Sequence, residues 1–212
     1  MRYLLLFCLG VAAFATDRES YVQVTMERKD GNEWKSLDPR TVLNAADRIR
    51  FKFEANYTGF LYVYDKASDG STERLFPGSG ADNRIEAGKA YIVPTDGSFV
   101  IDGPPGFDVT YWILSPEPLA RIPMFDDAPK VANLPSTIVP RCKEGLVARG
   151  SSGCLDDRAG AQQTKDASKI VPKAESTLRA RNIKVEKAGE TRIAAPSSKS
   201  APLIYEFRVA HK

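Results

Sequence analysis

The sequence predicts a mainly β protein: a small antiparallel sandwich or partly open barrel, with a loosely ordered basic C-terminal region and a returning final strand. Three observations lead to this prediction. Apolar and polar side chains alternate along several segments of residues 16–122, as in strands with one solvated face. Turn residues recur roughly every eight to twelve positions. Most aromatic residues lie in residues 16–122, so we expect the packed core there.

The alternation is clearest in residues 48–54 (RIRFKFE). Ile49, Phe51 and Phe53 fall on one face and the charged residues on the other, which predicts a strand with one buried and one solvated side. Residues 21–28 follow the same period. Further strands in this part are expected at residues 60–64, 73–76, 91–94 and 108–114.

Two apolar segments carry more specific expectations. Residues 60–64 (FLYVY) are apolar on both faces, which is typical of a central strand covered on both sides. Trp112 lies in an apolar strand, so we expect it in the core rather than on a carbohydrate-binding surface. The final segment, residues 203–209 (LIYEFRV), again has period two. An unpaired terminal strand this apolar would invite aggregation, so we expect it to fold back onto the β domain.

The region between residues 123 and 202 is weaker in pattern and net basic. It contains one aromatic residue, Phe125, and should be mostly surface or loosely ordered. One or two helical turns are expected at 166–171, before Pro172. A short edge strand is expected around residues 183–185.

The first 15 residues have the pattern of a secretory signal peptide. Arg2 is followed by an apolar stretch, residues 3–14, that is too short to span a bilayer. Ala13 and Ala15 place small residues where a signal peptidase reads them, which predicts cleavage after Ala15; an uncleaved anchor or a buried helix is the alternative. The expected units are a signal peptide (1–15), a β domain (16–122), a basic region with a disulfide loop (123–202) and a docking terminal strand (203–212).

Export would place the remaining cysteines where a disulfide is the expected state. Cys8 would leave with the signal peptide, and Cys142 and Cys154 would remain as a pair in an oxidising compartment. A disulfide between them would close a short loop and stabilise the protein by about 3 kcal/mol in the chain-entropy model. A metal site is less favoured, because the loop offers only Glu144 as a further ligand.

The residue types predict no catalytic, cofactor-binding or metal-binding side chains. The single histidine, His211, makes His-centred metal sites and Ser-His-Asp catalysis improbable. The aspartates Asp65 and Asp69 flank an expected hairpin and do not follow a calcium-loop pattern, so we expect them to cap turns. The same holds for the pairs 126–127 and 156–157. Paired carboxylates for glycoside hydrolysis stay open, because their separation depends on the fold.

The charge pattern limits the possible partners. A net charge of +3 is too small to indicate a polyanion partner by itself. The basic stretch 165–192 is interrupted by acidic residues and lacks aromatic residues that would stack on bases. We therefore expect a solvated surface there, with contact to an anionic polymer as the alternative, and no nucleic-acid binding.

Several short motifs resemble a known family when they are taken in order. They are residues 47–51 (DRIRF), 56–63 (NYTGFLYV), 75–77 (LFP), 83–88 (NRIEAG) and 92–94 (IVP). Together they resemble the domain-of-unknown-function family numbered 4384, over roughly residues 40–120. Two positions depart from its pattern: Ala46 stands where a Gly often precedes the Asp-Arg pair, and Gly78 stands where an Asn often follows Leu-Phe-Pro.

The resemblance implies an exported bacterial protein with a small β domain, often an accessory to larger envelope or signalling proteins. Residues 202–208 also resemble the end of exported proteins with this domain. The resemblance implies no established activity and no catalytic residues.

These observations lead to one expectation about function. We expect a periplasmic or extracellular, non-catalytic accessory or interaction module of the bacterial cell envelope, not membrane-spanning once the signal is removed. Its partner would be another envelope protein or an anionic envelope polymer. Two alternatives are an envelope hydrolase that uses carboxylates or a Ser-Lys pair, and a structural protein that contacts polyanions.

Overall fold

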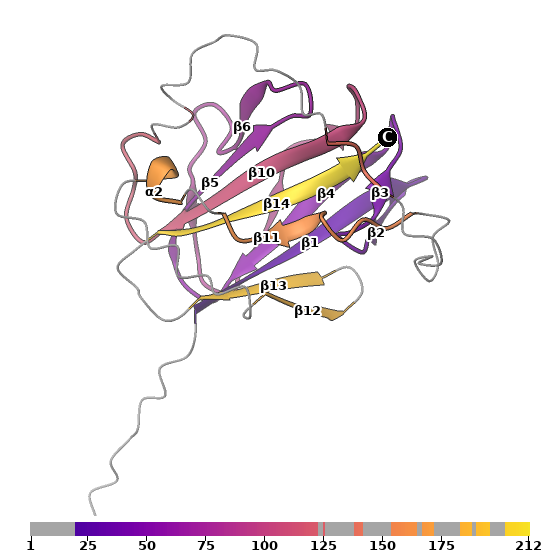
Figure 1. The fold of residues 1–212 in the computed structure, drawn as a ribbon. Coiled ribbons are helices and arrows are strands. Elements are labelled where there is room, and N and C mark those ends of the chain that lie inside the picture. Colours follow the sequence, from indigo (N-terminus) through magenta and orange to yellow (C-terminus); the bar gives the residue numbers. More distant parts are fainter. Residues whose placement is uncertain are drawn as a thin grey trace, which may run out of the picture.

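The computed structural model is a β-sandwich in which two largely antiparallel sheets pack face to face (Figure 1). This arrangement confirms the predicted fold class and selects the sandwich from the two alternatives. No helix among the described residues has the length and apolar character that crossing a membrane would require. The structure describes residues 20–122, 125, 138–141, 154–164, 167–171, 183–187, 190–195 and 202–212.

The first sheet has seven strands. They are β1 (Ser20–Asp30), β2 (Glu33–Ser36), β4 (Arg48–Ala55), β8 (Ala90–Val93), β9 (Phe99–Val100), β12 (Ile183–Lys187) and β13 (Glu190–Ala195). Their order is β12-β13-β1-β4-β8, with β2 paired to β1 and β9 paired to β4. Burial alternates strictly along β4, where Ile49, Phe51 and Phe53 are buried, as the period-two pattern predicts.

The second sheet also has seven strands. They are β3 (Val42–Leu43), β5 (Gly59–Lys66), β6 (Thr72–Phe76), β7 (Arg84–Ile85), β10 (Gly106–Ser115), β11 (Gly160–Gln162) and β14 (Leu203–His211). Their order is β11-β14-β10-β5-β6, with β3 paired to β14 and β7 to β5. The final strand β14 lies between β10 and β11, beside β10 along its whole length (Figure 1). The predicted return of the chain end is thus confirmed.

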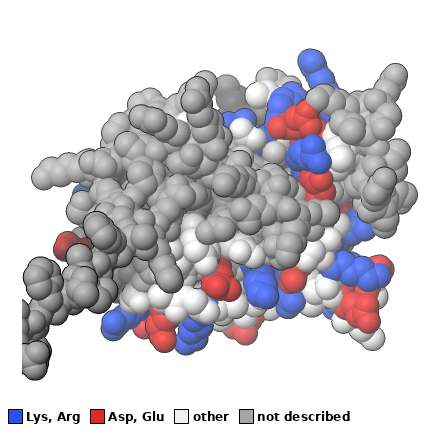
Figure 2. Space-filling model, turned by 90° about the horizontal axis from the view of Figure 1, so that it is seen from below, with Lys and Arg blue, Asp and Glu red and all other residues white. Residues whose placement is uncertain are grey.

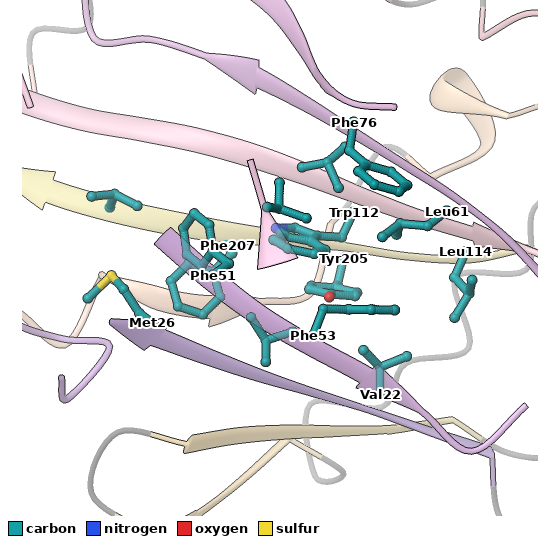
Figure 3. Close-up of a cluster of buried hydrophobic side chains, with 14 of the residues drawn as sticks. Val22, Met26, Phe51, Phe53, Leu61, Phe76, Trp112, Leu114, Tyr205 and Phe207 are labelled. Carbon is teal, nitrogen blue, oxygen red and sulfur yellow. The ribbon is translucent and has the colours of Figure 1, made fainter. Parts of the chain in front are cut away.

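The core lies between the two sheets and is organised around Trp112 (Figure 3). The Phe51 ring meets the Trp112 ring edge-on with centroids 5.5 Å apart, and Phe53 and Tyr205 stack against Trp112 at 5.6 and 5.9 Å. Phe207 packs edge-on against Phe51 at 5.2 Å. Such aromatic pairs add about 0.5–1.5 kcal/mol each beyond the burial of area. Trp112 is fully buried, which confirms its core role.

A second apolar cluster covers the outer face of the second sheet. Tyr62 and Tyr64 of β5 project there and pack with Ile122 and with α2 (Ala167–Ile170). Phe125 stacks on Tyr64 with ring centroids 4.3 Å apart. Strand β5 is therefore covered on both sides, as its uninterrupted apolar run predicts. The helical turn expected near residues 166–171 is present as α2.

The described parts of the basic region also join the sheets. Strand β13 pairs with β1, from Ser20 opposite Ala195 to Thr25 opposite Glu190. Strand β11 pairs with β14 through three residues. The expected edge strand is present as β12. The sequence did not predict β11 and β13, because each is short and is stabilised by backbone hydrogen bonds from a longer neighbour rather than by its own apolar pattern.

Two buried tyrosines, Tyr205 and Tyr62, differ in the hydrogen bonding of their hydroxyl groups. The Tyr205 Oη atom is buried and has no hydrogen-bond partner within the described residues, and burial raises the pKa of Tyr205, so the group stays protonated. By contrast, the Tyr62 hydroxyl donates to the Leu119 carbonyl oxygen at 3.2 Å and accepts from the Leu119 N–H at 2.8 Å.

We predict opposite effects for the same substitution at these two tyrosines. Tyr205→Phe should raise the free energy of unfolding by about 1 kcal/mol, because it removes an unsatisfied buried hydroxyl. Tyr62→Phe should lower it by about 1 kcal/mol, because it breaks two hydrogen bonds. Urea denaturation of both variants measures the difference; a loss of stability in Tyr205→Phe would contradict the assignment.

Candidate functional site

Two cavities lie on opposite sides of the second sheet. The first, which we call the outer pocket, has a volume of about 400 Å³ and lies on the outer face of that sheet. Phe107, Val109 and Tyr111 of β10, together with Lys66, Arg158 and Arg208, line it. The second, which we call the acidic pocket, has a volume of about 390 Å³ and lies between the sheets at one end of the sandwich. Asp65, Glu73, Asp108, Phe51 and Phe99 are among its lining residues.

Strand register builds the outer pocket. Val109 pairs with Lys66 on one side and with Arg208 on the other, so three neighbouring strands place two cations around an apolar residue. Two strand spacings put the backbones of Lys66 and Arg208 about 10 Å apart. The described residues that line the pocket include three cationic side chains and no acidic one.

Arg158 is fixed in place at this pocket. Its guanidinium donates to both carboxylate oxygens of Asp156, at 3.0 and 2.6 Å, and to the Val139 carbonyl oxygen at 3.0 Å. Its Cζ atom lies 5.1 Å from the centroid of the Phe107 ring. Hydrogen bonds from Arg158, and then from the backbone N–H groups of Arg141 and Arg158, hold the pKa of Asp156 well below its usual range. The geometry is that of a bidentate Arg–carboxylate pair.

Arg208 has an anchor of the same kind. Its Nη2 atom donates to Glu206 Oε2 at 2.9 Å, and Glu206 lies two residues away on the same face of β14. Both arginines of the outer pocket are therefore oriented before any ligand arrives, which lowers the entropy that binding would lose.

The charge of the outer pocket contrasts with the surface in Figure 2. On that face, among the residues drawn in colour, basic and acidic side chains are interspersed. Single exposed ion pairs of this kind contribute little to stability, with a median of about 0–1 kcal/mol. Among the described residues that line the outer pocket, every charged side chain is basic, although Arg158 and Arg208 each have a carboxylate partner beside the pocket.

Asp65 dominates the electrostatics of the acidic pocket. It lies on the inner face of β5, opposite Thr110 of β10 and Glu73 of β6. Its Oδ1 atom is buried without a hydrogen-bond partner in the described part of the chain. Burial, with smaller contributions from the charges of Asp108 and Glu73, raises the pKa of Asp65 to about 8. The carboxyl group is therefore protonated near neutral pH and able to donate a hydrogen bond.

Asp108 is held differently from Asp65. Its Oδ1 atom accepts the Ser68 N–H at 2.7 Å and lies 3.2 Å from Nε2 of His211, which is buried at the end of β14. The acidic pocket thus brings together a protonated carboxyl and a hydrogen-bonded carboxylate, an arrangement able to support general acid–base chemistry. Among the residues described, no group of three or more His, Cys, Asp or Glu side chains is placed to hold a metal ion.

The expectations about aspartates are only partly confirmed. Asp69 Oδ1 accepts the Ser71 N–H at 2.7 Å, and Asp156 accepts the Arg158 N–H, so both cap turns as predicted. Asp65 does not cap a turn, and that prediction is wrong, because the residue belongs to β5 and points between the sheets. Its place in the period-two pattern, after Leu61 and Val63 on the inward face, was the signal that would have shown this.

The predicted disulfide and cleavage site involve residues that the structure does not describe. Ala13, Ala15 and Cys142 lie outside the described residues, as do Asp126, Asp127 and most of the basic stretch 165–192. Cys154 is described and packs against a small apolar cluster formed with Val42 and Phe107. The disulfide between Cys142 and Cys154 stays a prediction.

These features define a two-sheet β-sandwich with a cation-lined pocket on one outer face. Residues 42–118 match the family model described as Domain of unknown function (DUF4384), which confirms the resemblance seen in the sequence. The matched segment begins in β3 and ends just after β10. No curated protein and no solved structure matches the chain.

The structure explains one departure from the family pattern. Ala46, which stands where the family often has Gly, has a positive φ of 68° in the turn before β4. Its N–H donates to the Ile101 carbonyl oxygen at 2.8 Å, so the turn is held in this conformation. The left-handed conformation costs a residue with a Cβ about 1–2 kcal/mol, which is why Gly suits this position.

We predict that Asp65 makes stability fall as pH rises. Because its folded-state pKa of about 8 lies above the unfolded value of 3.8, its stabilising contribution is complete below the unfolded pKa and is lost as pH rises through the folded pKa. The loss approaches about 1.4 kcal/mol per pH unit between these values. Asp65→Asn should remove this dependence, and urea denaturation across that pH range measures it.

The exposed Asp69 provides the control for this experiment. Its pKa is lowered by the hydrogen bonds from Ser71, so Asp69→Asn should leave the pH dependence near neutral pH unchanged. A constant stability difference between the wild type and Asp65→Asn from pH 5 to pH 8 would show that Asp65 is ionised throughout, contrary to the assignment.

Proposed function

We propose that this protein is an exported, non-catalytic interaction module of the bacterial cell envelope that binds another envelope protein at its outer pocket. The signal-peptide pattern of residues 1–15 and the family resemblance support export. The outer pocket supports binding, and it is the one observation on which the proposal depends.

The composition of the outer pocket is that of an interaction site. Val109 and Tyr111, beside the buried Phe107, offer apolar surface in its floor, while Lys66, Arg158 and Arg208 supply positive charge around that floor. Aromatic residues and arginine are the types enriched at protein–protein interfaces. A partner with acidic side chains would gain both electrostatic steering and burial of apolar surface there.

The proposed disulfide would reinforce this site. Asp156 Oδ2 accepts the Arg141 N–H at 2.6 Å, so the residue before Cys142 and the segment after Cys154 are already held together. A disulfide between these cysteines would tether the two segments that position Arg158. In an oxidising compartment such a bond would persist.

The acidic pocket favours a second candidate function, a hydrolase of wall polymer or protein. Asp65 would be the general acid and Asp108 the carboxylate partner, which is the division of roles that paired carboxylates need. The Ser-Lys alternative has less support, since the buried Ser68 hydroxyl donates to the Pro104 carbonyl oxygen at 2.9 Å. Turnover of envelope polymer that disappears in both Asp65→Asn and Asp108→Asn would favour this hydrolase over the interaction module.

We predict that a partner crosslinks to the outer pocket and not to the acidic one. A photoreactive amino acid would replace Ile138, an exposed apolar residue of the outer pocket, or Val100, an exposed apolar residue of the acidic pocket. Irradiation of cells should give a discrete crosslinked product from position 138 only. Lys66→Glu should reduce its yield about tenfold, the effect of a loss of about 1.4 kcal/mol in binding.

The matched control for Lys66→Glu is Lys29→Glu, which reverses an exposed charge on β1 of the first sheet. That variant should leave the crosslink at position 138 unchanged. Equal crosslinking from positions 138 and 100, or a product insensitive to Lys66→Glu, would count against the outer pocket as the binding site.

A further inference from the structure

The cations of the outer pocket differ in how they are neutralised. Arg158 and Arg208 each have a carboxylate partner, Asp156 and Glu206. The ammonium group of Lys66 has no ion pair within the part of the chain that the structure describes. Lys66 is therefore the cation whose charge a ligand would neutralise, and Arg208 lies one strand beyond Val109 to help hold the same anionic group.

The apolar half of this face already accepts an aromatic ring. Phe125 stacks on Tyr64 with an interplanar angle of 9° and packs against Tyr111 at a centroid distance of 5.3 Å. Tyr111 also lines the outer pocket, next to Val109 on the same face of β10. A second ring or branched side chain can therefore pack beside Tyr111, over Val109.

We propose that the outer pocket binds a short acidic peptide segment in which a carboxylate side chain is adjacent to an aromatic or branched apolar side chain. The carboxylate lies between Lys66 and Arg208, and the apolar side chain covers Val109 and Tyr111. This inference rests on the proposed function and specifies the chemistry of the partner segment.

The apolar floor decides between a peptide and an anionic polymer. A phosphate-rich polymer would satisfy Lys66 and the arginines but would bring no apolar group to the exposed parts of Val109 and Tyr111. A peptide with adjacent acidic and apolar side chains contacts both parts of the pocket. A volume of about 400 Å³ is at the low end of the range for ligand sites, which suits one or two side chains rather than a large surface.

Fluorescence anisotropy with the full chain and labelled short peptides tests the proposal. The probe contains an Asp-Phe-Asp core within a Gly/Ser frame; the matched peptides carry Asn-Phe-Asn or Asp-Ala-Asp instead. We expect the first peptide to bind about tenfold more tightly than either of the others, because each control removes one of the two kinds of contact. Polyphosphate, added as a competitor, represents an anionic polymer.

Variants of the chain separate charge from folding. Lys66→Glu should weaken binding of the Asp-Phe-Asp peptide about tenfold, whereas Lys66→Arg, which keeps the charge, and Lys29→Glu should bind within about twofold of the wild type. Circular dichroism of each variant confirms that the sheets are intact. Equal affinity for the Asp-Phe-Asp and Asp-Ala-Asp peptides would overturn the proposal, because the apolar floor would then be unused.

The outcomes also separate this inference from the proposed function. Lys66-dependent binding of polyphosphate with no binding of the Asp-Phe-Asp peptide would overturn the peptide proposal. If the crosslink at position 138 nevertheless depends on Lys66, the interaction module stands with a different ligand. If neither peptide binding nor the crosslink is observed, the peptide proposal and the interaction module are both wrong.

Discussion

The pairing of the last strand with β10 is the interaction on which the rest of the structure depends. Strand β14 pairs with β10 although the two strands are about a hundred residues apart in the sequence. The buried Thr110 hydroxyl of β10 donates to the Phe207 carbonyl oxygen of β14 at 3.0 Å. Tyr205 and Phe207 then complete the aromatic packing around Trp112 and Phe51. Because side chains alternate along a strand, the same pairing turns Glu206 and Arg208 toward the outer face. One strand thus completes both the core and the outer pocket.

The two pockets differ in how much of their lining comes from the family segment, which is the part of the chain that matches the family model (residues 42–118). Residues 42–118 supply almost all of the acidic pocket, to which the rest of the chain adds Val209. The outer pocket is instead assembled from both parts: its β10 floor and Lys66 belong to the family segment, whereas Arg158 and Arg208 do not. A binding site built partly from strands outside the family segment changes when those strands change. Proteins that share the family segment therefore need not share the ligand proposed for the outer pocket.

Two carboxyl environments show how burial and partners decide charge. Asp156 is almost fully buried yet keeps its charge, because Arg158 and two backbone N–H groups surround it with donors. Asp65 is half-buried, with other carboxylates nearby and a buried Oδ1 atom that has no donor within the described residues, so burial raises its pKa. The ionised Asp156 holds Arg158 in position, whereas Asp65 is a protonated carboxyl group between the sheets near neutral pH.

The sequence alone determined the fold class, because alternation in residues 48–54 and 203–209 is a property of the local chain that any pleated strand preserves. It also indicated the family resemblance of residues 42–118 and the burial of Trp112. Only the tertiary structure decided that β11 and β13 join the sheets, and that Asp65 lies near Glu73 and Asp108. It alone placed Lys66, Val109 and Arg208 in one row. Their proximity comes from cross-strand register, which depends on hydrogen bonds between segments far apart in the chain and leaves no local pattern in the sequence.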